Sequence, residues 1–125
     1  MNKKPRYIRW FNELSIDDVP LVGGKNASLG EMYRELGAVG VRVPNGFAIT
    51  AEAYRDILTE ADLWEPLTKL LSDIDKTKLE QLGKKAQQAR ELIYSATFPD
   101  DLRHQILDAY EQLEQEYSPE LSVAV

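Results

Sequence analysis

The chain has 125 residues, the length of one domain or of part of one, and 43% of them are hydrophobic, which allows a real core. Its formal net charge of −6 counts against a broad surface for nucleic acid or for an anionic membrane. There is no cysteine, which excludes disulfides, thiolate metal sites and cysteine nucleophiles and fits a cytoplasmic location. No apolar run approaches the length that spans a membrane.

The first third of the chain is predicted to hold short extended pieces and one helix. Residues 7–11 are aromatic and β-favouring, so we expect a short strand, followed by a loop over residues 12–20 and an extended piece at Leu21-Val22. From Leu29 the apolar residues recur at the spacing of one helix face, and Gly37 suits the position just after a helix end. The apolar residues of this face are Leu29, Met32, Tyr33 and Leu36.

The middle of the chain changes from turn chemistry to helical periodicity. Residues 41–49 are predicted to form strand, turn and strand, because Pro44-Asn45-Gly46 supplies turn residues. Thr50 is expected to cap the next helix, whose apolar residues fall between Tyr54 and Ala61.

The last half is predicted to be mainly helical. We expect a short helix over residues 63–71 and longer ones over residues 79–93 and 102–113, with Pro99 opening the last of them. Leu121 to Val125 is β-like in composition. Short strands first, helices after them and a strand at the end favour the α+β class, with several packed helices.

The segment Gly23-Gly24-Lys25 is the strongest candidate for chemistry. Glycine allows close backbone approach, a helix N-terminus offers unpaired N–H donors with a partial positive charge, and Lys25 adds a full charge. Such a group suits a diphosphate or triphosphate. It is not a Walker A loop, because the position that needs its first glycine is Val19. The alternative is a plain glycine turn before a helix, with an exposed lysine.

Gly30 is unusual because it lies inside the predicted helix. A glycine there costs about 1 kcal/mol relative to alanine. Close packing or the approach of a ligand would explain its presence.

Other titratable residues are better explained as structural. His104 is the only histidine, and its place off the apolar stripe predicts that it faces water. The carboxylate pairs Asp17-Asp18, Asp73 with Asp75, and Asp100-Asp101 are typical of caps and turns. We therefore assign no catalytic residue and no metal ligand within the chain.

Two segments carry a family resemblance. Residues 22–32 are VGGKNASLGEM, and residues 43–50 are VPNGFAIT, followed by Ala53-Tyr54. Their order and spacing resemble the N-terminal region of the phosphoenolpyruvate synthase and pyruvate phosphate dikinase family, which rifampicin phosphotransferase also resembles. The synthase branch is the more similar, because the dikinase branch more often has a glycine directly after the lysine. The resemblance covers the whole chain, and residues 22–54 carry it most strongly.

The resemblance implies that residues 1–125 are the N-terminal lobe of an ATP-grasp-like nucleotide-binding domain. Lys25 would contact ATP phosphates, and Gly23 and Gly24 would form the phosphate-approach loop. The whole protein would convert ATP, pyruvate and water to AMP, phosphoenolpyruvate and phosphate through a phosphohistidine. His104 does not match the family's phosphorylated histidine.

The resemblance also implies what lies outside this chain. The second lobe with its Mg²⁺-binding carboxylates, the phosphohistidine domain and the pyruvate-binding domain would all follow it. ATP would therefore bind with Mg²⁺ held by ligands beyond this chain, and the fragment alone would be inactive.

The expected partners are ATP and the remainder of the same polypeptide, with self-association of an isolated lobe, and neither nucleic acid nor membrane. A different hypothesis is a stand-alone nucleotide-binding or interaction module without catalysis. The strand expected at Leu121 to Val125 favours a fragment of a larger domain. The acceptor substrate stays open.

Overall fold

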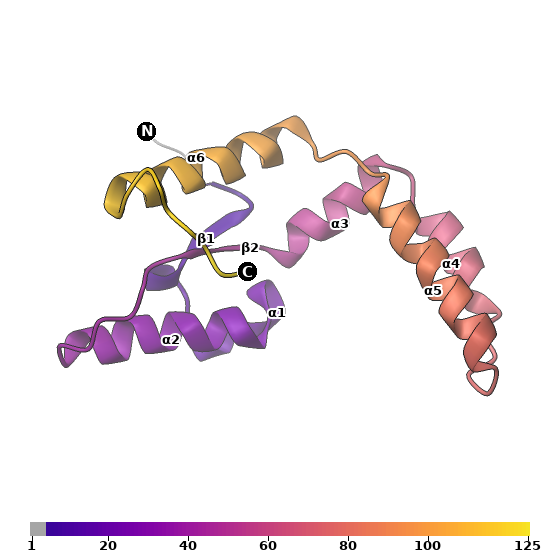
Figure 1. The fold of residues 1–125 in the computed structure, drawn as a ribbon, viewed down its shortest axis with the longest axis horizontal. Coiled ribbons are helices and arrows are strands. Elements are labelled where there is room, and N and C mark those ends of the chain that lie inside the picture. Colours follow the sequence, from indigo (N-terminus) through magenta and orange to yellow (C-terminus); the bar gives the residue numbers. More distant parts are fainter. Residues whose placement is uncertain (1–4) are drawn as a thin grey trace. The chain divides into compact units, whose positions relative to one another are not determined.

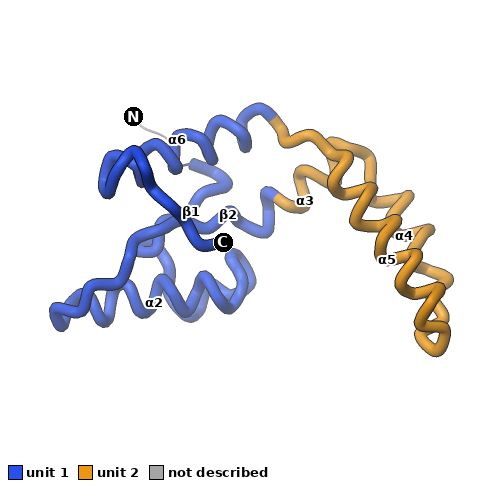
Figure 2. The backbone as a smooth tube through the Cα atoms, viewed as in Figure 1, with its two compact units in different colours: residues 1–53, 100–125 blue, residues 54–99 orange. Residues whose placement is uncertain are grey.

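The computed structural model describes residues 5–125, which form an α+β structure in two compact units. Unit 1 combines the described residues up to 53 with residues 100–125, and unit 2 comprises residues 54–99 (Figure 2). Segments from both ends of the chain therefore build unit 1. The expected α+β class is confirmed.

A two-stranded antiparallel sheet lies in unit 1. β1 (Ile8–Trp10) pairs with β2 (Phe47–Ile49), and the Phe11 N–H donates to the Gly46 carbonyl at 3.1 Å just beyond the ladder. The rings of Trp10 and Phe47 face each other across the pair, with centroids 5.5 Å apart. The strand predicted over residues 7–11 is thus confirmed in its centre.

The segment after β1 is more helical than expected. It forms the 3₁₀ turns η1 (Phe11–Glu13) and η2 (Ile16–Asp18) and the short helix α1 (Val19–Val22). The predicted loop over residues 12–20 is therefore largely wrong, and so is the extended piece at residues 21–22.

The turn before α1 and a proline favour this short helix, although its residues are β-favouring. The Ser15 N–H donates to Asp18 Oδ2 at 2.8 Å within η2, which turns the chain just before α1. Pro20 lies in the first turn, where its missing N–H costs nothing and its fixed φ suits a helix. The Gly23 N–H donates to the Val19 carbonyl at 2.8 Å and closes the turn.

The helix α2 (Gly24–Ala38) ends at a different glycine from the one predicted. Gly37 lies within the helix, whereas Gly40 adopts the left-handed conformation with φ +85°. The Gly40 N–H donates to the Gly37 carbonyl, and the Val41 N–H donates to the Leu36 carbonyl at 2.9 Å. This pair of bonds is a Schellman motif, which satisfies carbonyls that the helix end leaves open.

Two further predicted strands are not formed. Residues 41–43, before the expected turn at residues 44–46, and residues 121–125 have no regular secondary structure, because neither finds a strand partner within the described chain. The strand expected after that turn is confirmed as β2. The loop at residues 41–46 is held by a side chain instead, since the Asn45 N–H donates to the Tyr117 hydroxyl at 2.6 Å.

The sheet of unit 1 lies between α2 and α6 (Asp100–Glu116) (Figure 1). On the α2 side, the 3₁₀ and helical segment after β1 packs with α2 and β2 around one cluster of buried side chains. This cluster on the α2 side consists of Phe11, Leu14, Val22, Ala27 and Ala48.

On the other side of the sheet, Leu102 and Ala109 of α6 are buried. The helix predicted over residues 102–113 is confirmed as α6, and Pro99 directly precedes it.

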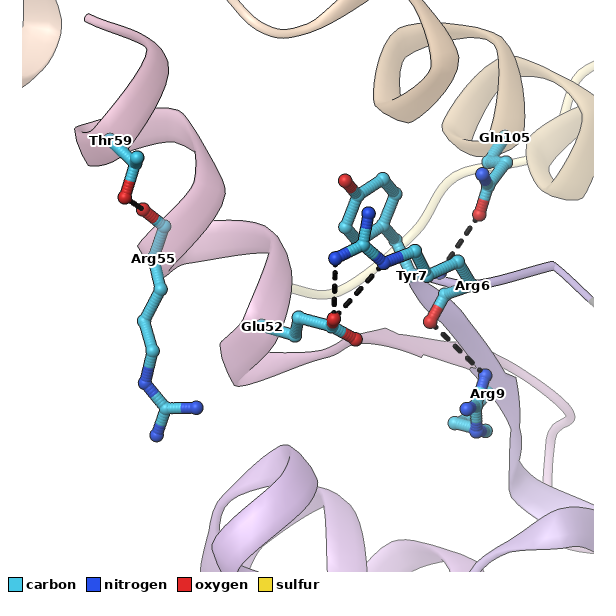
Figure 3. Close-up of polar contacts among 7 residues, drawn as sticks. All are labelled: Arg6, Tyr7, Arg9, Glu52, Arg55, Thr59 and Gln105. Atoms are coloured by element: carbon cyan, nitrogen blue, oxygen red, sulfur yellow. Dashed lines mark hydrogen bonds and ion pairs between the residues drawn. The ribbon is translucent and has the colours of Figure 1, made fainter.

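The N-terminal edge of the sheet is anchored by polar contacts (Figure 3). The Tyr7 N–H donates to Gln105 Oε1 of α6 at 2.8 Å. The Thr50 N–H donates to the Tyr7 carbonyl at 2.9 Å. The guanidinium of Arg6 pairs with Glu52 at 2.6 Å, although both side chains are largely exposed and such pairs contribute little.

Thr50 does not cap α3 (Ala51–Glu60) with its side chain as expected. It does precede the helix, but its hydroxyl is buried and has no hydrogen-bond partner among the described residues. Its backbone serves the turn, because the Ala53 N–H donates to the Thr50 carbonyl at 3.1 Å.

Unit 2 contains the rest of α3, then α4 (Trp64–Ser72) and α5 (Leu79–Tyr94), which confirm the helices predicted over residues 63–71 and 79–93. Its buried cluster is small and consists of Leu58, Leu63 and Leu67, and α5 contributes only half-buried residues to it.

No helix in the described part of the chain is long and apolar enough to cross a membrane.

Candidate functional site

The glycines of the first motif join two helices rather than a strand and a helix. α1 ends at Val22, and α2 begins at Gly24, so the helix starts at the glycine segment as expected. Gly23 has φ +82° and ψ 163°, a conformation that strongly favours glycine. A Cβ built on Gly23 or Gly24 would meet no described atom within 4 Å. The expected helix N-terminus is therefore present and approachable.

Lys25 is the second residue of α2 and is exposed. Within residues 5–125 it forms no hydrogen bond and no ion pair. The first N–H groups of a helix have no partner inside it, and they carry a partial positive charge. An unpaired ammonium therefore accompanies unpaired backbone donors at one helix end.

Lys25 lines a pocket of about 520 Å³ in unit 1. The volume falls within the range of roughly 300–1,000 Å³ that is typical of ligand sites. Its walls come from the first turns of α2, from β2, from α6 and from residues 123–125. Most of the lining is apolar, with Asn26 beside Lys25 as a polar neighbour. The apolar residues that β2 and α6 contribute include Phe47, Ile49, Ile106 and Leu113.

The structure separates the three residues of the predicted site. Lys25 lines the pocket, whereas Gly23 and Gly24 do not. They lie at the corner between α1 and α2, next to it in sequence.

Sequence reasoning missed Tyr110 and Asn45 as pocket residues. Tyr110 was predicted only as part of the apolar stripe of α6, and its hydroxyl donates to the Leu121 carbonyl at 3.2 Å. Asn45 was predicted only as a turn residue. Neither position had a sequence signal, because each reaches the pocket only through the packing of α6 and the loop at residues 41–46.

Other features of the described residues do not include the three predicted site residues. A pocket of about 690 Å³ in unit 1 is lined by Tyr33, Arg34 and Arg42 among others, but by none of the three predicted residues. His104 is exposed on α6, as expected. Among the described residues, no group of three or more histidine, cysteine, aspartate or glutamate side chains could hold a metal ion.

The carboxylate pairs form caps and turns, as predicted. Asp18 accepts the Ser15 N–H, and Asp100 and Asp101 lie in the first turn of α6. Asp75 accepts both the N–H and the hydroxyl of Thr77, and the hydroxyl bond in particular holds the pKa of Asp75 below its ordinary value.

Comparisons with known proteins agree on one family. Residues 19–125 match the model of the pyruvate phosphate dikinase AMP/ATP-binding domain. The phosphoenolpyruvate synthase of Helicobacter pylori is 48% identical over 121 residues, which is 96% of this chain and 15% of that protein. The synthase of Aquifex aeolicus is 39% identical over 94% of this chain and 14% of its own length. The Escherichia coli synthase is 42% identical over 85% of this chain and 13% of its own. The chain therefore spans about 15% or less of these relatives.

Proposed function

Because the chain belongs to the family of the pyruvate phosphate dikinase AMP/ATP-binding domain, we propose that it forms the N-terminal lobe of the ATP-binding domain of a phosphoenolpyruvate synthase. The single observation that carries the assignment of the site is the position of Lys25. Lys25 lies in the first turn of α2 and lines a pocket of ligand size, and its ammonium is unpaired within the described residues. We propose an ATP-grasp-like architecture for the complete domain.

Each part of this site suits one part of ATP. Lys25 and the N–H groups of the first turn of α2 neutralise and bind the phosphates. The open backbone at Gly23 and Gly24 lets the phosphates approach closely. The apolar walls from β2 and α6 pack against the less polar part of the nucleotide.

The whole protein, in this proposal, converts ATP, pyruvate and water to AMP, phosphoenolpyruvate and phosphate. ATP phosphorylates a histidine outside this chain, and that histidine passes the phosphoryl group to pyruvate. Positioning and charge neutralisation do most of the work in such transfers. Mg²⁺ accompanies ATP and is held by residues beyond this chain. The remainder of the polypeptide is the chain's main partner, and we propose a cytoplasmic location.

The test is to replace Lys25 in the full protein that carries this chain. Lys25→Ala removes one charge-assisted contact, which is worth about 1.5–3 kcal/mol, so we expect Mg-ATP to bind roughly ten- to a hundredfold more weakly by calorimetric titration. Lys84→Ala is the matched control, because Lys84 is an exposed helical lysine of α5 outside this pocket. Wild-type affinity in Lys25→Ala would remove the assigned role.

A further inference from the structure

We propose that Asn26 is a positioning residue, which holds the corner between α1 and α2 so that Lys25 is presented to the pocket. The Asn26 Nδ2 donates to the Val22 carbonyl at 3.1 Å. This inference rests on the proposed role of Lys25 in binding phosphate. It concerns how the Lys25 side chain is oriented toward the pocket.

The backbone conformation of the corner between α1 and α2 is weakly restrained at Gly23. Gly23 has no side chain, its φ is +82°, and a Cβ there would touch nothing described. It is also the N-cap of α2, and no side chain caps the helix from that position. Glycine loses more conformational freedom on ordering than any other residue, so this junction needs bonds from its neighbours.

The bond from Asn26 compensates for that weakness. Backbone bonds across the corner run from the Gly23 N–H to the Val19 carbonyl and from the Ala27 N–H to the Gly23 carbonyl. The carbonyl of Val22 ends α1 and lacks an intrahelical partner, and the Asn26 side chain supplies one. This side-chain hydrogen bond joins the end of α1 directly to the first turn of α2.

Both ends of this bond are well placed to fix Lys25. Val22 is buried in the core cluster of unit 1, so its carbonyl is a stable anchor. Asn26 is half-buried and directly follows Lys25 in the first turn of α2. The early N–H groups of this turn have no helical bonds of their own, so the Asn26 bond restrains the turn that carries the lysine.

Two substitutions separate the bond from the side chain's bulk. The Asn26 bond crosses the non-helical Gly23, so it differs in geometry from a hydroxyl that donates four residues back within one helix. Leucine at position 26 is similar to asparagine in shape and has no donor. Glutamine keeps an amide N–H donor and has one more methylene with which to reach the Val22 carbonyl.

The experiment measures Mg-ATP affinity in the full protein for Asn26→Leu, Asn26→Gln, Lys25→Ala and the double variant Lys25→Ala with Asn26→Leu. We expect Asn26→Leu to weaken binding roughly five- to tenfold, the size of one net hydrogen bond, and Asn26→Gln to stay within about twofold of wild type. We expect the double variant to bind no more weakly than Lys25→Ala alone, because Asn26 acts through the lysine. Gln87→Ala removes an exposed helical amide of α5 and serves as a control.

Each contrary outcome has its own meaning. Equal affinities of Asn26→Leu and Asn26→Gln, or wild-type affinity in Asn26→Leu, would refute the role of the bond. Additive losses in the double variant would show that Asn26 acts independently of Lys25. Wild-type affinity in Lys25→Ala would instead refute the proposed function. Thermal unfolding checks that each variant folds, and Asn26→Ala replaces Asn26→Leu if leucine prevents folding.

Discussion

At the scale of single residues, Gly30 shows how a residue that weakens a helix can be required by packing. A Cβ on Gly30 would lie 2.5 Å from Leu14 Cβ and 3.1 Å from the Phe11 carbonyl oxygen. Real Cβ atoms do not approach so closely, and Leu14 is fully buried. Of the two explanations that sequence left open, close packing is therefore the one that the structure supports.

Gly30→Ala is predicted to lower the free energy of unfolding by about 1–3 kcal/mol, because overpacking outweighs the gain in helix propensity. Urea unfolding followed by circular dichroism measures it. Gly37→Ala in the same helix is the matched control, since a Cβ there meets no described atom within 4 Å. It should be neutral or stabilising by up to about 1 kcal/mol. Equal effects at both glycines would contradict the packing argument.

At the scale of elements, α6 is tied to the sheet by a side chain that joins distant parts of the sequence. Gln105 Oε1 accepts the N–H of Tyr7, a residue that is only 2% exposed (Figure 3). A buried backbone N–H that loses its acceptor carries a desolvation penalty. The bond therefore helps to keep α6, and with it one wall of the pocket, against β1.

Gln105→Ala is predicted to cost about 1–3 kcal/mol of unfolding free energy, because the Tyr7 N–H loses this acceptor. Gln112→Ala, at an exposed glutamine of the same helix, should change stability by less than about 0.5 kcal/mol. Both are measured by chemical denaturation. A similar loss in the two variants would show that the contact with Tyr7 is not what matters.

At the scale of the whole molecule, the candidate site belongs to unit 1. Unit 1 contains most of the buried hydrophobic residues, whereas unit 2 is a smaller helical unit whose longest helix has no fully buried residue. Both motifs of the family resemblance begin in unit 1, and the pocket is lined by that unit. The chain also spans about 15% or less of the length of the relatives named above, so the activity of the whole protein stays a proposal.

The 125-residue chain by itself is predicted to form no AMP from ATP and pyruvate. Its described residues offer no cluster that could hold a metal ion against the phosphates, and we assign it no catalytic residue. Chromatographic assay of AMP after incubation with Mg-ATP and pyruvate measures this, with the full protein as the positive control. AMP formation by the purified chain that persists after further purification would refute the prediction.

The sequence by itself determined the α+β class, the main helices, the strand around Ile8 and the family, because apolar periodicity and two spaced motifs are local properties of the chain. It did not predict α1, where the Ser15–Asp18 turn before the helix and Pro20 in its first turn outweigh the β preference of valine, or the helix end at Gly40. Only the tertiary structure decided that residues 121–125 form no strand and that Lys25 lines a pocket with β2 and α6. Strand pairing and pocket walls depend on segments far apart in sequence, and no local pattern encodes which of them will meet.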